Sequence, residues 1–288
     1  IAPNEDDFFK SFKFLGSLAL VMAIFVILYP ELFVDKESLQ NLLKRQKTGS
    51  TDIAVIWPGS TCAIFYFYIL LQRMIEKTEI KNVIWCSIFM GYIFLMQNRS
   101  TLICVAPFYL YGIIKANIKY KPGIIIIIFL VAGTYIFNII GGLIEETQQQ
   151  LDDVKYNRWQ AIYFFLMEQD NNLYTILFGN GVPCKDSAYL SYIMSAQTKR
   201  LAFISDIGLL GTYFYYGLAM IAVIYRFILK GIIDNRMPRF IRYYCWWILL
   251  VPTIHGFGLG ASLSMISFAI LFYLIIYYES PQKDGCIN

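Results

Sequence analysis

The sequence is poor in charged residues and has a single histidine, His255. Only 15% of its 288 residues are charged, against about 25% in a typical soluble domain. Apolar residues make up 58% of the chain, and the mean hydropathy is +0.54. No soluble domain of this length needs so much apolar surface, so we expect lipid to be the solvent for most of the chain. The net charge of +4 is too small to indicate binding to nucleic acid.

The signatures of several common catalytic sites are also missing. The six cysteines have no C-x-x-C spacing and four of them lie in apolar segments, so neither a zinc site nor a disulfide framework follows. The sequence contains no P-loop, no H-E-x-x-H helix and no Gly-x-Ser-x-Gly elbow. Metal-dependent and covalent serine chemistry are therefore unsupported, and we expect no metal and no cofactor.

What the chain does have is a series of long apolar segments. A helix needs about 20 apolar residues to cross the hydrocarbon core of a bilayer. The candidate spans are residues 13–30, 53–72, 83–97, 100–115, 122–143, 203–228, 240–255 and 259–278. We therefore predict an all-α fold, a polytopic transmembrane helical bundle of about eight spans that forms one membrane domain over residues 1–288. Because the chain starts at Ile1 without a signal peptide, we expect a fragment whose N-terminal spans are missing.

Basic residues are sorted by side of this predicted bundle. If the N-terminus is cytoplasmic, every short inside loop is basic, as the positive-inside rule requires. The inside loops then hold Lys10, Lys13, Arg73, Lys77, Lys81, Lys115, Lys119, Lys121, Arg226, Lys230, Arg236, Arg239 and Lys283. The outside receives residues 31–52, a tight helical hairpin turn at Arg99, and the long loop 144–202.

The long outer loop is predicted to be folded. Loops of this length are uncommon and are usually functional or disordered. Apolar residues recur at helical spacing in 156–166 and again in 187–194, and Gly179-Asn180-Gly181 is a turn signal between them. We expect one or two interfacial helices, joined by this glycine turn and lying over the membrane domain.

Two arginines are the main candidates for substrate contact. Arg158 lies in the first predicted loop helix, and Arg99 lies in the hairpin turn, followed by Ser100 and Thr101 at the next helix start. Each could be a snorkelling side chain at the interface. Each could equally be an anion clamp, because guanidinium is always charged and binds phosphate bidentately.

A second group of candidates surrounds the start of the sixth span. Lys199 and Arg200 precede it as interfacial anchors or substrate contacts, and Ser205 and Asp206 lie just inside it. A carboxylate one turn into an apolar helix needs a partner or a polar cavity. Asp206 could pair with an arginine or accept a proton. His255, at the outer end of the seventh span, is explained more simply as a capping or packing residue than as a catalyst.

These features together resemble a known family. The hairpin at Asn98-Arg99-Ser100, Asn157-Arg158-Trp159 in the long loop, Leu177-Phe178-Gly179-Asn180-Gly181, and the run from Ser205 to Gly211 resemble the superfamily of O-antigen polymerases and ligases, in order and in spacing, over about residues 83–278. The resemblance implies a metal-independent glycosyltransferase of the bacterial inner membrane, with the loop 144–202 in the periplasm. It implies undecaprenyl diphosphate-linked oligosaccharide as substrate, with a chain-length regulator and a flippase as partners.

The resemblance carries two residues over as ligands of the diphosphate, Arg99 and Arg158. We predict Arg99, Arg158 and Asp206 as catalytic, and Ser100, Lys199 and Arg200 as substrate-binding. Ligases of the superfamily have a histidine after the glycine turn, and none occurs between Gly181 and Gly211 here. This favours polymerase over ligase and leaves Asp206 and Asp186 as candidate bases.

Two other classes of protein remain as alternatives. A polysaccharide or lipid transporter should carry ionisable or helix-breaking residues at mid-membrane depth, and the mid-span positions here are almost wholly apolar. An accessory scaffold in envelope assembly would leave Arg99 and Arg158 replaceable.

Overall fold

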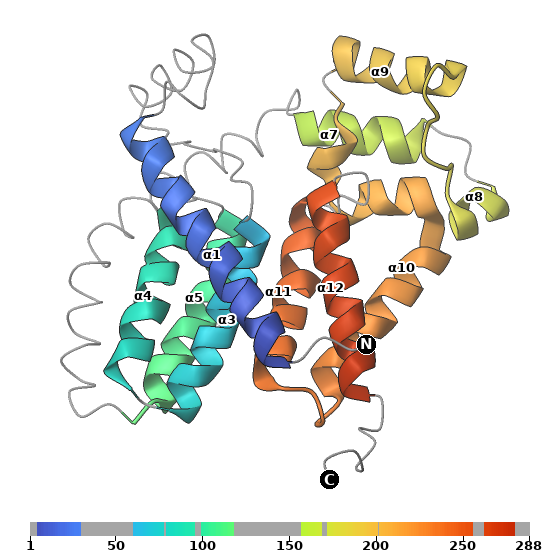
Figure 1. The fold of residues 1–288 in the computed structure, drawn as a ribbon. Coiled ribbons are helices and arrows are strands. Elements are labelled where there is room, and N and C mark those ends of the chain that lie inside the picture. Colours follow the sequence, from blue (N-terminus) through green and yellow to red (C-terminus); the bar gives the residue numbers. More distant parts are fainter. Residues whose placement is uncertain are drawn as a thin grey trace. The chain divides into compact units, whose positions relative to one another are not determined.

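The computed structural model describes eight stretches of this chain, and their regular structure is helical throughout (Figure 1). These stretches are residues 5–29, 60–77, 79–95, 99–117, 157–168, 172–200, 202–255 and 262–279. The all-α fold class predicted from the sequence is confirmed for this part of the chain.

The chain divides into two compact units, Ile1–Ile144 and Glu145–Asn288. The first contains α1 (Glu5–Leu28), α3 (Ser60–Glu76), α4 (Ile80–Leu95) and α5 (Arg99–Lys115). The second contains α7 (Asn157–Ile162), the π-helix η2 (Tyr163–Met167), α8 (Leu173–Phe178), α9 (Ala188–Arg200), the 3₁₀-helix η3 (Ile204–Ile207), α10 (Leu209–Ile233), α11 (Arg239–His255) and α12 (Ser262–Glu279). The prediction of a single membrane domain stays a prediction.

In the first unit, α3 is the central helix. It packs against α1, α4 and α5, and its consecutive residues Phe67 and Tyr68 are both fully buried. A helix that is apolar on all sides can be buried on all sides. The surrounding helices expose apolar side chains outward, such as Phe14 of α1, which is 67% exposed. The Ser87 and Tyr109 hydroxyls, 2.7 Å apart, join α4 to α5.

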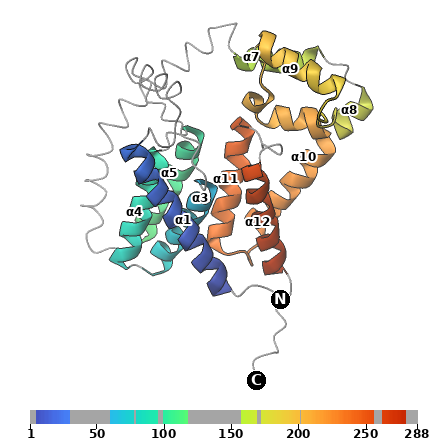
Figure 2. The same cartoon turned by 45° about the horizontal axis from the view of Figure 1, so that its top comes forward.

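In the second unit, α10 is the organising helix. It packs against α11 and α12 along one part of its length, and α8, η2 and η3 also contact it. Figures 1 and 2 both show α7 and α9 stacked at one end of this unit, with α8 beside the bend in α10. The described segments of the predicted long loop are therefore folded, and the helices predicted at 156–166 and 187–194 are confirmed as α7 with η2 and as α9.

The described helices follow the apolar segments of the sequence closely. Every candidate span except 122–143, which lies outside the described residues, overlaps a described helix, and the span 203–228 overlaps two. The two helices of the predicted hairpin are α4 and α5, which are in contact, and its turn at 96–98 also lies outside the described residues.

Within the described residues, two helical stretches are long and apolar enough to cross a membrane, Asp7–Phe25 and Leu209–Ile233. Three further apolar helices, Ile80–Phe94, Thr101–Lys115 and Phe268–Glu279, are shorter. A core helix of a soluble protein or a signal sequence can meet the same test, so these two stretches give weak support for membrane association. The eight-span topology stays a prediction.

The span predicted at residues 203–228 stays a prediction, but these residues do not form one continuous helix. The segment starts with η3, and Gly208, with φ 57° and ψ −126°, separates η3 from α10. Within α10, Gly217 has φ 71° and ψ 179°, which breaks the helix and turns the chain (Figure 1). Only the part from Leu218 to Ile233 continues as an uninterrupted helix.

Candidate functional site

The candidate site is built on a group of elements that we call the loop cluster: α7, η2, α9, η3 and the first part of α10. These elements share one apolar core. Its buried members are Ala161, Phe164, Phe165, Ile193, Ala196, Ala202, Ile207 and Phe214. The cluster is therefore a folded body, and its core fixes the backbone of the residues on its surface.

Aromatic pairs link η2 to α10 and to α9 within the loop cluster. The Phe165 and Phe214 rings meet at 4.8 Å between centroids in an edge-to-face arrangement, and Phe164 contacts Tyr192 of α9 at 5.3 Å. Such aromatic pairs add about 0.5–1.5 kcal/mol each beyond the area that they bury. The π-helical turn η2 places Phe164 and Phe165 side by side in this core.

The loop cluster brings together the elements that carry four of the six predicted site residues. Arg158 is the second residue of α7, and α7 packs directly against η3, which contains Ser205 and Asp206. Lys199 and Arg200 end α9, which also packs against α7. The backbone thus places Arg158 and Asp206 on neighbouring elements. Whether they pair with each other or face a substrate stays a prediction.

Asp206 lies in a different element from the one that the sequence predicts. We expected this carboxylate one turn inside an apolar span, where it would need a partner. Asp206 instead lies in the 3₁₀ turn η3, ahead of α10 and separated from it by Gly208. Its position therefore does not require burial within a transmembrane helix.

Lys199 and Arg200 have a structural explanation that the sequence did not suggest. They are the last two residues of α9, and cations at a helix C-terminus are stabilised by the helix dipole. Lys199 is exposed. The two residues are separated from α10 by η3, so they do not directly precede the sixth span as predicted.

Two glycines hold the predicted glycine turn against the break in α10. Gly179 and Gly217 have nearly the same unusual backbone conformation, with φ 77° and ψ 178° at Gly179 and φ 71° and ψ 179° at Gly217. A Cβ atom on Gly179 would lie 2.3 Å from the Tyr215 carbonyl oxygen, and one on Gly217 would lie 2.3 Å from the Leu177 carbonyl oxygen. Only glycine allows both this conformation and this contact. We call this contact the glycine junction.

Backbone hydrogen bonds complete the glycine junction. The N–H groups of Asn180 and Gly181 donate to the carbonyl oxygens of Phe214 and Tyr215 at 2.8 and 3.0 Å. The Asn180 side-chain amide also donates to the Phe214 oxygen, at 3.2 Å. In an unbroken helix these two carbonyls would accept from the N–H groups four residues further on. The turn therefore satisfies the carbonyls that precede the break.

Sequence reasoning missed Asn180, Gly217 and Tyr189 as site-forming residues. The signal for Gly217 was a glycine inside an apolar helical pattern, and that for Asn180 was its place between two glycines. The hydroxyl of Tyr189 in α9 donates a hydrogen bond to the Gly181 carbonyl oxygen of the same turn, at 3.5 Å. Burial, with the nearby Tyr215 and Tyr192, raises the pKa of Tyr189 to about 12, so its hydroxyl is a neutral donor.

The remaining candidates lie elsewhere. Arg99 and Ser100 are the first two residues of α5 in the first unit, followed by the buried Thr101. The diphosphate-sized gap predicted between Arg99 and Arg158 involves both units and stays a prediction. His255 is the last residue of α11, as expected for a residue at a helix end. Asp186 is exposed in a turn with φ 62°, on the chain between the glycine turn and α9.

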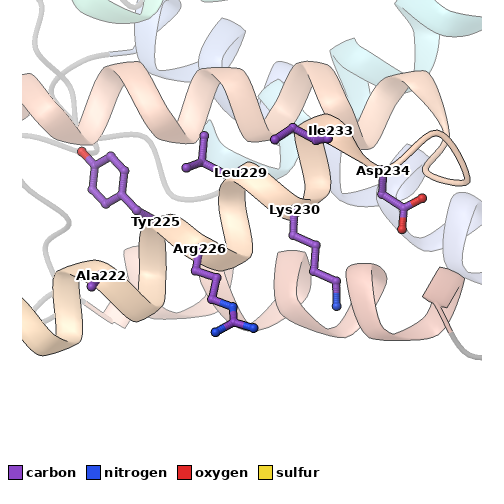
Figure 3. A pocket seen from close by; sticks show the side chains of 7 residues that line it. All are labelled: Ala222, Tyr225, Arg226, Leu229, Lys230, Ile233 and Asp234. Carbon is purple, nitrogen blue, oxygen red and sulfur yellow. The ribbon is translucent and has the colours of Figure 1, made fainter.

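A separate cavity of about 560 Å³ lies along the last turns of α10, at the end remote from the loop cluster. One face of α10 from Ala222 to Asp234 lines it, and its walls are mainly apolar (Figure 3). Arg226 and Lys230 contribute the cationic groups. None of the predicted site residues lines this cavity.

Ion pairs organise the chain at this same end of α10. Lys230 pairs with Glu279 of α12. Arg236 pairs with Asp234, and the distance from Arg236 Nη2 to Asp234 Oδ2 is 2.6 Å. The hydrogen bonds from Arg236 lower the pKa of Asp234 to about 2. The first pair links α10 to α12, and the second stabilises the turn that follows α10.

Among the described residues, no group of three or more His, Cys, Asp or Glu side chains is placed to hold a metal ion. No protein-family model, no curated protein and no solved structure matches this chain. The resemblance to the superfamily of O-antigen polymerases and ligases therefore stays a prediction from the sequence.

Proposed function

We propose that this chain is a multi-pass membrane polymerase of the bacterial inner membrane that elongates a polysaccharide. It transfers a growing glycan from undecaprenyl diphosphate to a hydroxyl of the next lipid-linked repeat unit at the periplasmic face. The acceptor oxygen forms a bond to the anomeric carbon, and the bond from that carbon to the diphosphate breaks. Undecaprenyl diphosphate leaves as an anion, and the hydroxyl proton passes to a base or to water.

The observation that carries this proposal is the packing of α7 on η3. It brings the helix that bears Arg158 against the turn that bears Asp206, on a folded body at the start of α10. A diphosphate leaving group is already stable as an anion, so fixed cations can supply much of the catalysis. Arg158 and Arg99 would bind the diphosphate, and Asp206 would orient the acceptor hydroxyl or accept its proton.

Exposure along the two long helical stretches supports a membrane location. Only 22% of the apolar window is buried in Asp7–Phe25, and the same share is buried in Leu209–Ile233. A core helix of a soluble protein would have most of such a window buried. Lipid is the solvent that would cover so much apolar helix surface.

One observation, the break in helix α10, favours the transporter alternative. Transporters use discontinuous helices whose freed carbonyls bind ions or substrate. Here the carbonyls of Phe214 and Tyr215 already accept hydrogen bonds from Asn180 and Gly181. Since the break has no open ligand atoms at these positions, it supports a structural junction better than a transport site.

The test compares Arg99→Ala and Arg158→Ala with Arg226→Ala, which removes an arginine at the remote end of α10. Each variant would be expressed in a strain that lacks the gene, and surface glycans would be separated by gel electrophoresis. We expect the first two variants to yield single-repeat products and Arg226→Ala to yield the normal ladder. Arg158→Lys should restore the ladder only partly, because a point charge lacks the bidentate fork.

Other outcomes distinguish the rival functions. Long chains that are not attached to their final acceptor would indicate a ligase, and lipid-linked repeats held in the cytoplasm would indicate an exporter. A normal ladder from both Arg99→Ala and Arg158→Ala, with protein at the wild-type level in the membrane, would refute the diphosphate site.

A further inference from the structure

The short helix α8 of the second unit is largely exposed. None of its six residues is buried, although most of them are large and apolar. Leu173 is 73% exposed, Tyr174 70% and Phe178 58%, and Val182 just beyond the glycine turn is 53% exposed. A soluble surface would rarely gather such residues in one place.

The glycine junction fixes α8 at a definite height along α10. The turn after α8 donates two backbone hydrogen bonds to Phe214 and Tyr215, immediately before the break at Gly217. Both views show α8 beside the bend of α10 and displaced from α7 and α9 toward the rest of α10 (Figures 1 and 2). The depth of Gly217 in a bilayer therefore sets the depth of α8.

The length of α10 after the break gives that depth. From Gly217 to Ile233 the helix is roughly 24 Å long at 1.5 Å per residue, shorter than the hydrocarbon core of about 30 Å. Arg226 comes before its end, and its charge must reach the inner headgroups, whereas Lys230 pairs with Glu279. Arg226 lies only about 14 Å from Gly217 along this helix, so the break falls inside the hydrocarbon core. Any tilt of α10 moves it still further from the outer surface.

From these observations we propose that α8 is immersed in the outer leaflet of the bilayer, as a re-entrant element of the long loop. This inference rests on the membrane-spanning role of α10 in the proposed function. Lipid acyl chains cover the exposed face of α8. They also cover the exposed apolar side chains of α10, such as Leu218 and Val223.

The chemistry of the segment suits this location. No Asp, Glu, Lys or Arg occurs between residues 171 and 184. Non-helical backbone is tolerated at membrane depth only where its polar groups are paired. The Asn172 side chain caps the start of α8, the Gly179 N–H bonds to Thr175, and the N–H groups of Asn180 and Gly181 bond to α10.

Immersion of α8 also bears on the substrate. Undecaprenyl diphosphate carries a long isoprenoid tail that must remain in lipid while its diphosphate reaches the loop cluster. An apolar helix in the outer leaflet, attached directly to the start of α10, would give that tail a surface to lie along.

The experiment places a fluorescent amino acid at one position at a time in the full chain, reconstituted in phosphatidylcholine vesicles. The three positions are Phe178 of α8, Val223 of α10 as the reference for lipid, and Met194 of α9 as the reference for water. Val223 is 51% exposed and Met194 53%, so both references are close to Phe178 in exposure. Lipids brominated on their acyl chains quench fluorophores in the bilayer, and iodide quenches those in water.

We expect the probes at positions 178 and 223 to lose most of their fluorescence to brominated lipid, and the probe at 194 to lose it to iodide. If position 178 responds to iodide and not to brominated lipid while position 223 responds to lipid, immersion of α8 is wrong and the span stands. If position 223 also fails to respond to lipid, the membrane-spanning premise is wrong as well. The same probe at Tyr174, also highly exposed, should repeat the result for position 178.

Discussion

The two units of this chain hold their helices together in different ways. In the first unit, large side chains of α3 such as Phe67 and Tyr68 fill the space between neighbouring helices. In the second unit, α8 meets α10 backbone to backbone at Gly179 and Gly217, with no side chain between them. Side-chain packing can adjust to changes in volume, whereas a contact between backbones cannot. The second unit therefore has a backbone contact with little tolerance for added volume beside its candidate site.

One methyl group added at the glycine junction should destabilise the fold most. Gly179→Ala and Gly217→Ala should each lower the free energy of unfolding by several kcal/mol, since about 1–3 kcal/mol of backbone strain adds to a clash with a carbonyl group. Thermal unfolding of the detergent-solubilised protein measures the loss.

Two other glycines serve as controls for that substitution. Gly181 has φ 79° but no neighbouring atom within 4 Å of its Cβ position, so Gly181→Ala should show the strain alone. Gly91 has neither feature, and Gly91→Ala should leave the unfolding temperature unchanged. Equal effects at Gly91 and Gly217 would contradict the backbone contact.

A smaller and graded effect is expected in the core of the first unit. Phe67→Ala should cost about 3–5 kcal/mol because it leaves a cavity, and Phe67→Leu should cost clearly less because it restores most of the volume. Chemical denaturation of the three proteins gives the comparison. A loss for Phe67→Leu as large as that for Phe67→Ala would show that this core is as intolerant as the glycine junction.

A polar contact in the first unit should matter less. Tyr109→Phe removes the hydroxyl that lies 2.7 Å from that of Ser87, and we expect a loss of about 1 kcal/mol. Ser87 also donates to the Val83 carbonyl oxygen, so it keeps one partner. A double-mutant cycle with Ser87→Ala isolates the pair, and a coupling energy of zero would contradict the α4–α5 contact.

The smallest effect is a dependence on pH at the end of α10. Arg236 holds the pKa of Asp234 near 2, below its ordinary value of 3.8, so this pair stabilises the folded state above about pH 4 and is lost as pH falls toward 2. Asp234→Asn should therefore flatten the pH dependence of unfolding only in this acidic window. A change confined to pH 6–8 would point to another group.

The sequence predicted the positions of the helices well because apolar segments and glycine signals are local. It placed the start of α1 too late, since Glu5, Asp6 and Asp7 fall outside an apolar window. Acidic residues in a first turn nevertheless favour a helix start, and Lys10 pairs with Asp7 at 3.1 Å.

The break at Gly217 and the position of Asp206 could not be predicted in the same way. In the sequence, Gly217 is one glycine in an apolar run that suits a continuous helix. Its conformation depends on contact with Leu177 and Gly179, almost 40 residues away. The placement of Asp206 follows from the same folding of the loop onto α10. Whether Arg99 joins Arg158 depends on contacts between the two units, which no local pattern specifies.

The proposed function requires Arg158 in the loop cluster to act on a lipid diphosphate without a metal. The most direct measurement incubates the purified full chain in vesicles, with EDTA present, with lipid-linked repeat units extracted from a strain that lacks the gene. We expect a ladder of elongated products from the wild type and from Arg226→Ala, and unreacted single repeats from Arg158→Ala. A ladder from Arg158→Ala equal to that of the wild type would refute the role of Arg158. Loss of the wild-type ladder on addition of EDTA would refute catalysis without a metal.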